Sequence, residues 1–340
     1  AGMMEMNKET ADLAELVVRA VLWAASLSGT RLPLLWLYPR NLPAVAVLSH
    51  DSDNNEPGKA MAMLGVVARA GIRSTWCTMA NGYPPDVIES IRAAGHELAM
   101  HFDAMSEGTV WSEQEFRAQH SALCRLFGET PVTNKNHYLR WEGDIEFYEW
   151  CERAGIRLDQ SKGASKTGTA GFNFGTCHLF RPVRHDGSAL DVWEMPTVTQ
   201  DMIVFAPPQL GDALRESVLR ANGVYHLLFH PAHIETAGVA DALLEAVAKA
   251  REAGMEWWTG RDVVEWETAR WGIRWRDYQV GESAEAEVTL ASDRGLKDAT
   301  VLWLDEAGDI ERWGHRFTGQ QSDIEPGEMA RTFNCGIGMV

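Results

Sequence analysis

Two aspartates separated by a single serine follow an apolar segment near residue 50. Residues 44–49 are mostly apolar and contain two valines, which predicts a buried strand, and Asp51 and Asp53 come directly after it. Side chains alternate along a strand, so the two carboxylates are expected to point the same way. In parallel α/β folds, ligands bind at the carboxyl ends of the strands. Such a pair can bind a cation and accept a proton from water.

Histidines close several other strand-like segments. His101 ends the segment 96–101, His137 ends 132–137 and His230 ends 224–230. Packing does not require an imidazole at each of these strand ends, whereas imidazole and carboxylate together are typical zinc ligands. The residues therefore predict a hydrolytic metal site. For Asp51 and Asp53, the alternative is a helix cap or a salt bridge, which is a common role of loop carboxylates.

Strand-like and helix-like segments alternate between about residues 42 and 270. Strands are predicted at 44–49, 73–79, 96–101, 132–137, 156–159, 191–195, 224–230 and 255–259. Helix signals stand between several of them, including a capping box at 112–115 and apolar positions at helical spacing over 240–253. Repeated β–α alternation predicts a parallel sheet, and this many units favour a barrel over an open sheet.

The flanking regions have a different character. A helix is expected from about Thr10 to Ser28, followed by a proline-punctuated connector, and residues 160–190 form a glycine-rich insertion with no helix or strand pattern. Beyond residue 271 the pattern indicates strands and turns only. The predicted domains are thus 1–41 (helix and connector), 42–270 (barrel) and 271–340 (a small β-rich domain).

Charge and cysteine usage limit the possible partners and compartments. The formal net charge of −17 argues against nucleic acid and anionic membranes as partners. The 5 cysteines lack any Cys-x-x-Cys spacing, which predicts reduced thiols. No export signal or membrane span is recognised, so a cytoplasmic location is expected, or an extracellular one if the N-terminus is truncated. The oligomeric state is left open.

The order of these motifs resembles that of the polysaccharide deacetylase family, the metal-dependent amide hydrolases of carbohydrate esterase family 4 type. The residues that carry the resemblance are His50-Asp51-Ser52-Asp53, Gly95 to His101, Lys135-Asn136-His137, Gly155 to Asp159 and Leu227 to Pro231. The resemblance covers about residues 42 to 270. It implies an incomplete or distorted (β/α) barrel, here with an N-terminal helix and a small C-terminal all-β appendage.

The resemblance also implies roles for the acidic and basic residues. Asp51 is expected to be the general base and Asp53 a metal ligand, with the reverse assignment left open. The family's arginine, which orients the base, corresponds to Lys135 or to Arg140. His230 matches the histidine that protonates the leaving amine.

The resemblance matches Asp159 to the acid of the fourth motif and Tyr138 to the aromatic residue of the third. From their own positions, Trp141 near a strand end and His178 on the glycine-rich insertion are further candidates for contacting the substrate. His50 and His226 lie in or beside apolar strands and are expected to be core residues with satisfied hydrogen bonds.

The metal ligands depart from the family pattern at one position. His101 is present, but Met105 stands where the family has a second histidine, and a thioether is a poor ligand for zinc. His137 is expected to replace it, with Asp103 in reserve. The implied cofactor is a divalent metal, preferentially zinc, and the implied function is removal of an amide-linked acetyl group from a saccharide or a related small amide. The alternative is a catalytically silent carbohydrate-binding or structural barrel domain of a larger protein.

Overall fold

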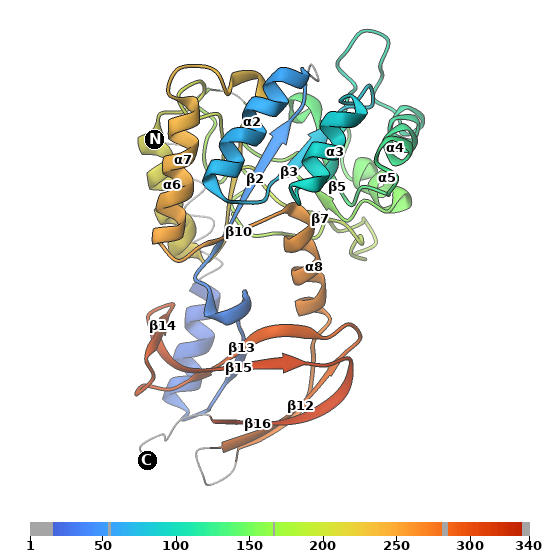
Figure 1. Cartoon of the computed structure of the whole chain (residues 1–340). Coiled ribbons are helices and arrows are strands. Elements are labelled where there is room, and N and C mark those ends of the chain that lie inside the picture. Colours follow the sequence, from blue (N-terminus) through green and yellow to red (C-terminus); the bar gives the residue numbers. More distant parts are fainter. Residues whose placement is uncertain (1–15, 54–55, 166, 281–284, 335–340) are drawn as a thin grey trace. The chain divides into compact units, whose positions relative to one another are not determined.

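The computed structural model describes residues 16–53, 56–165, 167–280 and 285–334 (Figure 1). The chain divides into two compact units. The first unit contains residues Ala44–Val264. The second unit joins the segment that ends at Pro43 to the segment that begins at Glu265. Each unit is described separately below.

A 9-stranded parallel sheet forms the centre of the first unit. Its strands are β2 (Val45–Asp51), β3 (Thr75–Thr78), β4 (Glu97–Phe102), β5 (Thr133–Asn136), β6 (Leu158–Asp159), β7 (Trp193–Glu194), β8 (Thr199–Gln200), β9 (Val224–Leu228) and β10 (Glu256–Trp258). They are hydrogen-bonded in the order β7-β6-β5-β4-β3-β2-β9-β8, and β10 pairs with β2. The sheet is curled but open, which confirms the predicted incomplete (β/α) barrel.

Strand β2 is the centre of this sheet, and all of its residues are buried. Its first half pairs with β9 and β10, and its last residues, Ser49 to Asp51, pair with β3. A strand with neighbours on both edges and helices outside the sheet must be apolar along its length, which accounts for the sequence of residues 44–48. Asp51 is therefore the last residue of a buried strand whose backbone is hydrogen-bonded to its neighbours, and its own partner is Cys77 of β3.

Helices follow most of the strands and lie on the outside of the curled sheet (Figure 1). They are α2 (Pro57–Ala70), α3 (Pro85–Ala93), α4 (Glu113–Phe127), α5 (Glu146–Ala154), α6 (Pro208–Ala221) and α7 (Val239–Glu252). The last helix, α8 (Gly260–Trp271), contains the boundary between the two units. The predicted capping box is present, because Ser112 Oγ accepts a hydrogen bond from the Glu115 backbone N–H at 3.2 Å. The neighbours along the outside are α3, α2, α7 and α6, with α4 against α5.

The glycine-rich insertion, residues 160–190, is irregular, as the sequence predicts. It is fixed to the sheet by isolated bridges, including Gly163 with Thr197 and Phe180 with Glu194. Gly163 has φ 144°, and a Cβ at this position would lie 2.3 Å from the carbonyl oxygen of Thr197. Only glycine permits this backbone approach. The insertion is therefore tied to the carboxyl side of β7 at a point that tolerates no side chain.

The second unit is built mainly from antiparallel strands. They are β1 (Pro33–Leu35), β11 (Arg274–Val280), β12 (Glu285–Ser292), β13 (Leu296–Leu304), β14 (Ile310–Arg312), β15 (His315–Ile324) and β16 (Gly327–Asn334). One sheet has the order β1-β13-β15-β14 and the other β11-β12-β16. Buried side chains from both sheets, such as Val288, Val301, Trp303 and Phe333, belong to one hydrophobic cluster. The predicted C-terminal all-β appendage is thus confirmed.

The segment before the barrel differs from the prediction in one respect. Residues 16–27 are helical, as expected, while residues 10–15 of the predicted helix lie outside the described residues. The predicted connector contains strand β1, and Leu34 pairs with Leu302 of β13. A strand of 3 residues with two leucines and one proline carries no periodicity, so it could be recognised only through its partner.

Among the described cysteines, Cys77, Cys124, Cys151 and Cys177 are not joined by disulfide bonds, and Cys335 lies outside the described residues. Within the described part of the chain, no helix is both long enough and apolar enough to cross a bilayer.

Candidate active site

The carboxyl ends of five neighbouring strands bring the predicted polar side chains together. The strands are adjacent in the order β5-β4-β3-β2-β9. The polar residues at or just beyond the ends of β2, β4, β5 and β9 are Asp51, Asp53, His101, Lys135, His137 and His230. This edge of the sheet is the one at which parallel α/β proteins bind ligands.

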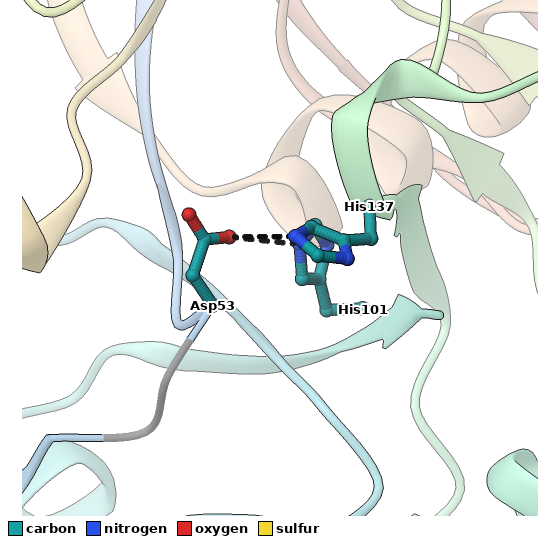
Figure 2. A group of neighbouring side chains, drawn as sticks. All are labelled: Asp53, His101 and His137. Atoms are coloured by element: carbon teal, nitrogen blue, oxygen red, sulfur yellow. Dashed lines mark ion pairs between the residues drawn. The ribbon is translucent and has the colours of Figure 1, made fainter. Parts of the chain in front are cut away.

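Asp53, His101 and His137 form a group with the composition of a metal site (Figure 2). Asp53 Oδ1 lies 3.3 Å from His101 Nε2 and 3.7 Å from His137 Nε2. Both Asp53 Oδ1 and His101 Nε2 are buried without a hydrogen-bond partner. Burying unpaired polar atoms is unfavourable, and a divalent cation between these atoms would satisfy them. The donor set therefore fits zinc, with one carboxylate, two imidazoles and an open position.

The structure places His137, and not Met105, beside Asp53 and His101. The Met105 side chain is 48% exposed, and its sulfur accepts a hydrogen bond from Arg140 at 3.5 Å. His137 follows strand β5, and its ring lies 5.3 Å from the ring of His101. Its use as a metal ligand in place of Met105 stays a prediction.

Both imidazoles are held by hydrogen bonds on the side away from Asp53. His101 Nδ1 lies 2.9 Å from the carbonyl oxygen of Lys135, which requires the proton on Nδ1 and leaves the Nε2 lone pair free. His137 Nδ1 lies 3.0 Å from Asp103 Oδ1. That oxygen also accepts the backbone N–H groups of Met105 and Ser106. Asp103 therefore lies behind His137 and orients it, a place that differs from the ligand role held in reserve for it.

Asp51 lies next to the buried ammonium group of Lys135. Lys135 is completely buried, and its Nζ lies 3.4 Å from Asp51 Oδ1. Nζ also donates to Ser49 Oγ, which lies 2.9 Å from Nε2 of the buried His226. Burial alone would raise the pKa of Asp51, but the nearby Lys135, His101 and His230 together outweigh it, and the pKa lies below its ordinary value. Asp51 is thus a carboxylate able to accept a proton, and the ion pair with Lys135 fixes the position of this carboxylate.

His101 experiences the same concentration of negative charge. Burial lowers the pKa of His101, but the carboxylates of Asp51 and Asp53 outweigh it, so the net shift is upward. A site that favours a proton on this imidazole favours positive charge in general. The electrostatics therefore agree with the unpaired atoms in indicating a cation site.

His230 faces the two aspartates from the end of β9. Its Nε2 lies 3.9 Å from Asp51 Oδ2 and 3.8 Å from Asp53 Oδ2. Its Nδ1 contacts the buried carboxylate of Asp201, which also accepts the His230 backbone N–H at 2.8 Å. Burial would lower the pKa of His230, but these carboxylates, Asp201 foremost, raise it to about 9. His230 is therefore a protonated imidazole near neutral pH.

Asp201, which pairs with His230, was not predicted. It follows β8, whose 2 residues, Thr199 and Gln200, are too few to show a strand pattern. Asp159 ends β6 and is also fully buried, and it accepts hydrogen bonds from Asn134 and Ser161. The catalytic role expected for Asp159 stays a prediction. In the sheet order, β8 lies next to β9, whereas β6 is separated from β9 by four strands.

The predicted substrate-contacting residues are placed differently from one another. Tyr138 is 70% exposed, and its ring lies 4.4 Å from that of His137. Trp141 is half-buried, and Lys162 Nζ lies 3.3 Å from the centre of its ring. His178 bonds to the carbonyl of Ala221, and the adjacent Cys177 carbonyl accepts the N–H of Val224, the first residue of β9. His178 therefore lies at the amino end of β9, opposite His230, and cannot contact a substrate at this site.

Backbone strain accompanies three of the site residues. Asp53 has φ 39°, Tyr138 has φ 57° and Asp201 has φ 20°, a region that residues other than glycine rarely adopt. Such conformations cost free energy and persist where surrounding contacts impose them. The predicted core histidines show no such strain: His50 and His226 are fully buried and hydrogen-bonded, as expected.

Comparisons with known proteins reveal the fold of this unit. No protein-family model matches the sequence, and no curated protein matches it. Among solved structures, one described as a polysaccharide deacetylase from Mycobacterium smegmatis has a TM-score of 0.54 and 19% identity, over 70% of this chain and 94% of that chain. The Puue allantoinase has a TM-score of 0.51 and 14% identity, over 67% and 91%.

A third structure, described as a polysaccharide deacetylase from Pseudomonas aeruginosa PAO1, has a TM-score of 0.52 and 13% identity, over 67% of this chain and 92% of that chain. The chain thus has the fold of these proteins. At such identities the likeness concerns the backbone, and the chemistry must be argued from the side chains.

Proposed function

We propose that this chain is a divergent member of the polysaccharide deacetylase family, a metal-dependent hydrolase of an amide-linked acetyl group. The observation that carries the proposal is the convergence of Asp53, His101 and His137, with unpaired buried atoms, next to Asp51 and His230. The fold shared with two proteins described as polysaccharide deacetylases supports the proposal. The allantoinase of the same fold is named for a small molecule, which keeps a small amide open as a substrate.

The proposed ligands are Asp53, His101 and His137. A bound divalent cation would supply Lewis acidity, which makes water a better nucleophile and polarises the substrate carbonyl. His101 is fixed in the correct tautomer by the Lys135 carbonyl, and His137 is oriented by Asp103.

Two residues of the chain transfer the protons. Asp51 accepts a proton from the attacking water while the water oxygen bonds to the carbonyl carbon. As the C–N bond breaks, His230 gives its Nε2 proton to the departing nitrogen. Asp201 holds the imidazole from its Nδ1 side and stabilises its positive charge. Lys135 acts through Asp51 as a positioning residue.

The substrate class proposed is a soluble acetylated saccharide or a related small amide. Tyr138 is exposed beside His137 and is positioned to contact such a substrate. Trp141 is a second aromatic surface on the segment that follows, although its ring already contacts Lys162.

The test measures acetate release from N-acetylated saccharides by protein loaded with zinc or cobalt and by chelated protein. Asp51→Asn should retain metal but lose turnover, because asparagine is nearly isosteric and cannot accept the proton. His230→Ala should lower turnover of the amide by roughly 10²–10⁴-fold, and turnover of an acetate ester with a good leaving group by less.

The matched control is His178→Ala, which removes a histidine at the opposite end of the sheet and should leave turnover unchanged. A fully active Asp51→Asn would contradict the base assignment, and equal losses on amide and ester for His230→Ala would contradict the acid assignment. Saccharide binding without a bound cation, and without acetate release after zinc or cobalt is added, would favour a silent carbohydrate-binding barrel.

A further inference from the structure

A second group of metal-ligating side chains lies on the far side of the His230 ring. Asp201, His230 and His233 each offer one ligand atom, and these atoms lie within 4.8 Å of one another. The group uses Nδ1 of His230, whereas the site described above faces Nε2 of the same ring. The two groups share no residue.

The local backbone brings the two imidazoles to one side. His230 is the residue before the 3₁₀ turn η3 (Pro231–His233), and the His233 N–H bonds to the His230 carbonyl at 3.0 Å. Residues three apart in such a turn project in the same direction. Both Nδ1 atoms therefore face the same carboxylate oxygen of Asp201, Oδ2.

Asp201 is presented by a constrained loop. Its φ of 20° is imposed by a turn in which the Val204 and Phe205 N–H groups both bond to the Asp201 carbonyl. Its other oxygen, Oδ1, accepts the His230 N–H, so Oδ2 is left for the imidazoles. The carboxylate is completely buried, whereas the His233 side chain is 31% exposed. Asp201 is thus the fixed, buried member of the group, and an ion can enter from the exposed side of His233.

The geometry of His233 matches that of the first group. His233 Nδ1 lies 3.3 Å from Asp201 Oδ2, yet it is buried without a hydrogen bond. The pair Asp53 Oδ1 and His101 Nε2 has the same separation, 3.3 Å, and the same lack of a hydrogen bond. Ligands of tetrahedral zinc at about 2.0–2.1 Å lie about 3.3 Å apart and point at the ion, not at each other. The pair His233 Nδ1 and Asp201 Oδ2 is therefore spaced for an ion between its atoms, as is the pair Asp53 Oδ1 and His101 Nε2.

We propose that Asp201, His230 and His233 form a second zinc site. Two imidazoles and one carboxylate with an open position suit zinc, whose ligands are nitrogen, sulfur and carboxylate oxygen. The contact between His230 Nδ1 and Asp201 would lengthen as the ion replaces the shared proton. A ring that holds an ion on Nδ1 carries one N–H and cannot be an imidazolium. The remaining proton is on Nε2, and releasing it would leave an imidazolate, so the ring is a much weaker acid. If the proposed function is correct, occupancy of the second site therefore weakens the proton donor, and excess zinc inhibits the enzyme.

The test counts zinc on the whole chain without any substrate. Chelated protein is dialysed against graded free zinc, and bound zinc is measured by mass spectrometry. The wild-type protein should bind two equivalents. His233→Ala should bind one, with the affinity of the second equivalent reduced at least tenfold, and His101→Ala should lose the other equivalent. His185→Ala is the matched control, because its side chain is 80% exposed and outside both groups, and it should still bind two.

Cobalt substitution adds a structural readout, since His233→Ala should remove one of two sets of visible d–d bands. Circular dichroism checks that the variant is folded, and His233→Gln replaces it if it is not. Saturation of the wild-type protein at one equivalent, or two equivalents in folded His233→Ala, would overturn the proposal. Because no turnover is measured, this result is independent of whether the deacetylase assignment holds. Where activity is found, His233→Ala should resist inhibition by excess zinc.

Discussion

The pairing of Lys135 with Asp51 should contribute strongly to stability, because both charges are buried. Their atoms are 3.4 Å apart, and at an effective dielectric constant of about 20 two unit charges at this distance attract by about 5 kcal/mol. Lys135→Met removes the ammonium and leaves the Asp51 carboxylate in the same enclosed place. Breaking a buried pair in this way costs about 3–5 kcal/mol. We expect Lys135→Met to lower the free energy of unfolding by that amount.

A double-mutant cycle isolates the interaction from the other effects of the substitution. The cycle comprises Lys135→Met, Asp51→Asn and the double variant, unfolded in urea with a chelator present so that metal does not contribute. The double variant leaves neither charge buried alone, so it should be more stable than the sum of the single effects predicts. The expected coupling energy is about 3 kcal/mol or more.

An exposed ion pair provides the control. Lys59 Nζ lies 3.2 Å from Glu56 Oε1, closer than the buried pair, but the two side chains are 30% and 47% exposed. Solvent screening should reduce the coupling in a Lys59→Met, Glu56→Gln cycle to less than about 1 kcal/mol. If both cycles give the same small coupling, burial does not strengthen the Lys135 pair, and the argument that Lys135 holds the Asp51 charge fails.

Three further outcomes are expected. Burial holds the pKa of His50 at about 3, against 6.5 in the unfolded chain, so the unfolded state binds the proton first. Stability from this group is complete above pH 6.5 and is lost as the pH falls toward 3. Between pH 7 and 5 the loss is about 2 kcal/mol, and His50→Asn should reduce the difference between urea unfolding free energies at these two pH values by that amount. Asp201→Asn should reduce turnover of an amide substrate at least about 100-fold but that of an activated ester by less, since it weakens the support of the His230 proton donor; equal losses would contradict this role. Gly163→Ala should destabilise the chain by about 3 kcal/mol because its Cβ would overlap the neighbouring backbone, whereas Gly168→Ala, with nothing within 4 Å, should cost about 1 kcal/mol of backbone strain. Thermal melting of the two glycine variants measures that difference, and equal melting temperatures would refute it.

The strand ends that carry the candidate site could be predicted because each signal is local. An apolar run followed by Asp51 and Asp53 is sufficient to predict the end of β2, and His101 and His137 close two further strands in the same way. Parallel strands then bring these ends to one edge of the sheet without any further information. The prediction that His137 lies beside His101 followed from the same rule and from the weakness of Met105 as a ligand.

The partner of His230 could not be found in this way because its position depends on strand order. Asp159 ends a strand of 2 residues and Asp201 follows another, and nothing in the sequence places β8 beside β9. The hydrogen bonds of Asp159 to Asn134 and Ser161 likewise depend on which strands are neighbours. His178 was misplaced for a related reason, since a long insertion can lie at either end of the sheet.

The pairing of β1 with β13 has a consequence for synthesis on the ribosome. Leu34 is translated long before its partner Leu302, and at about 5–20 residues per second the delay is roughly 15–50 s. Throughout this interval the first strand has no partner. The helix at residues 16–27 exposes apolar side chains, among them Val17 and Trp23, even in the finished chain. A nascent-chain chaperone would therefore be most useful for this early segment. Because β1 pairs with β13, a fragment intended to contain the barrel alone should omit both ends of the chain together.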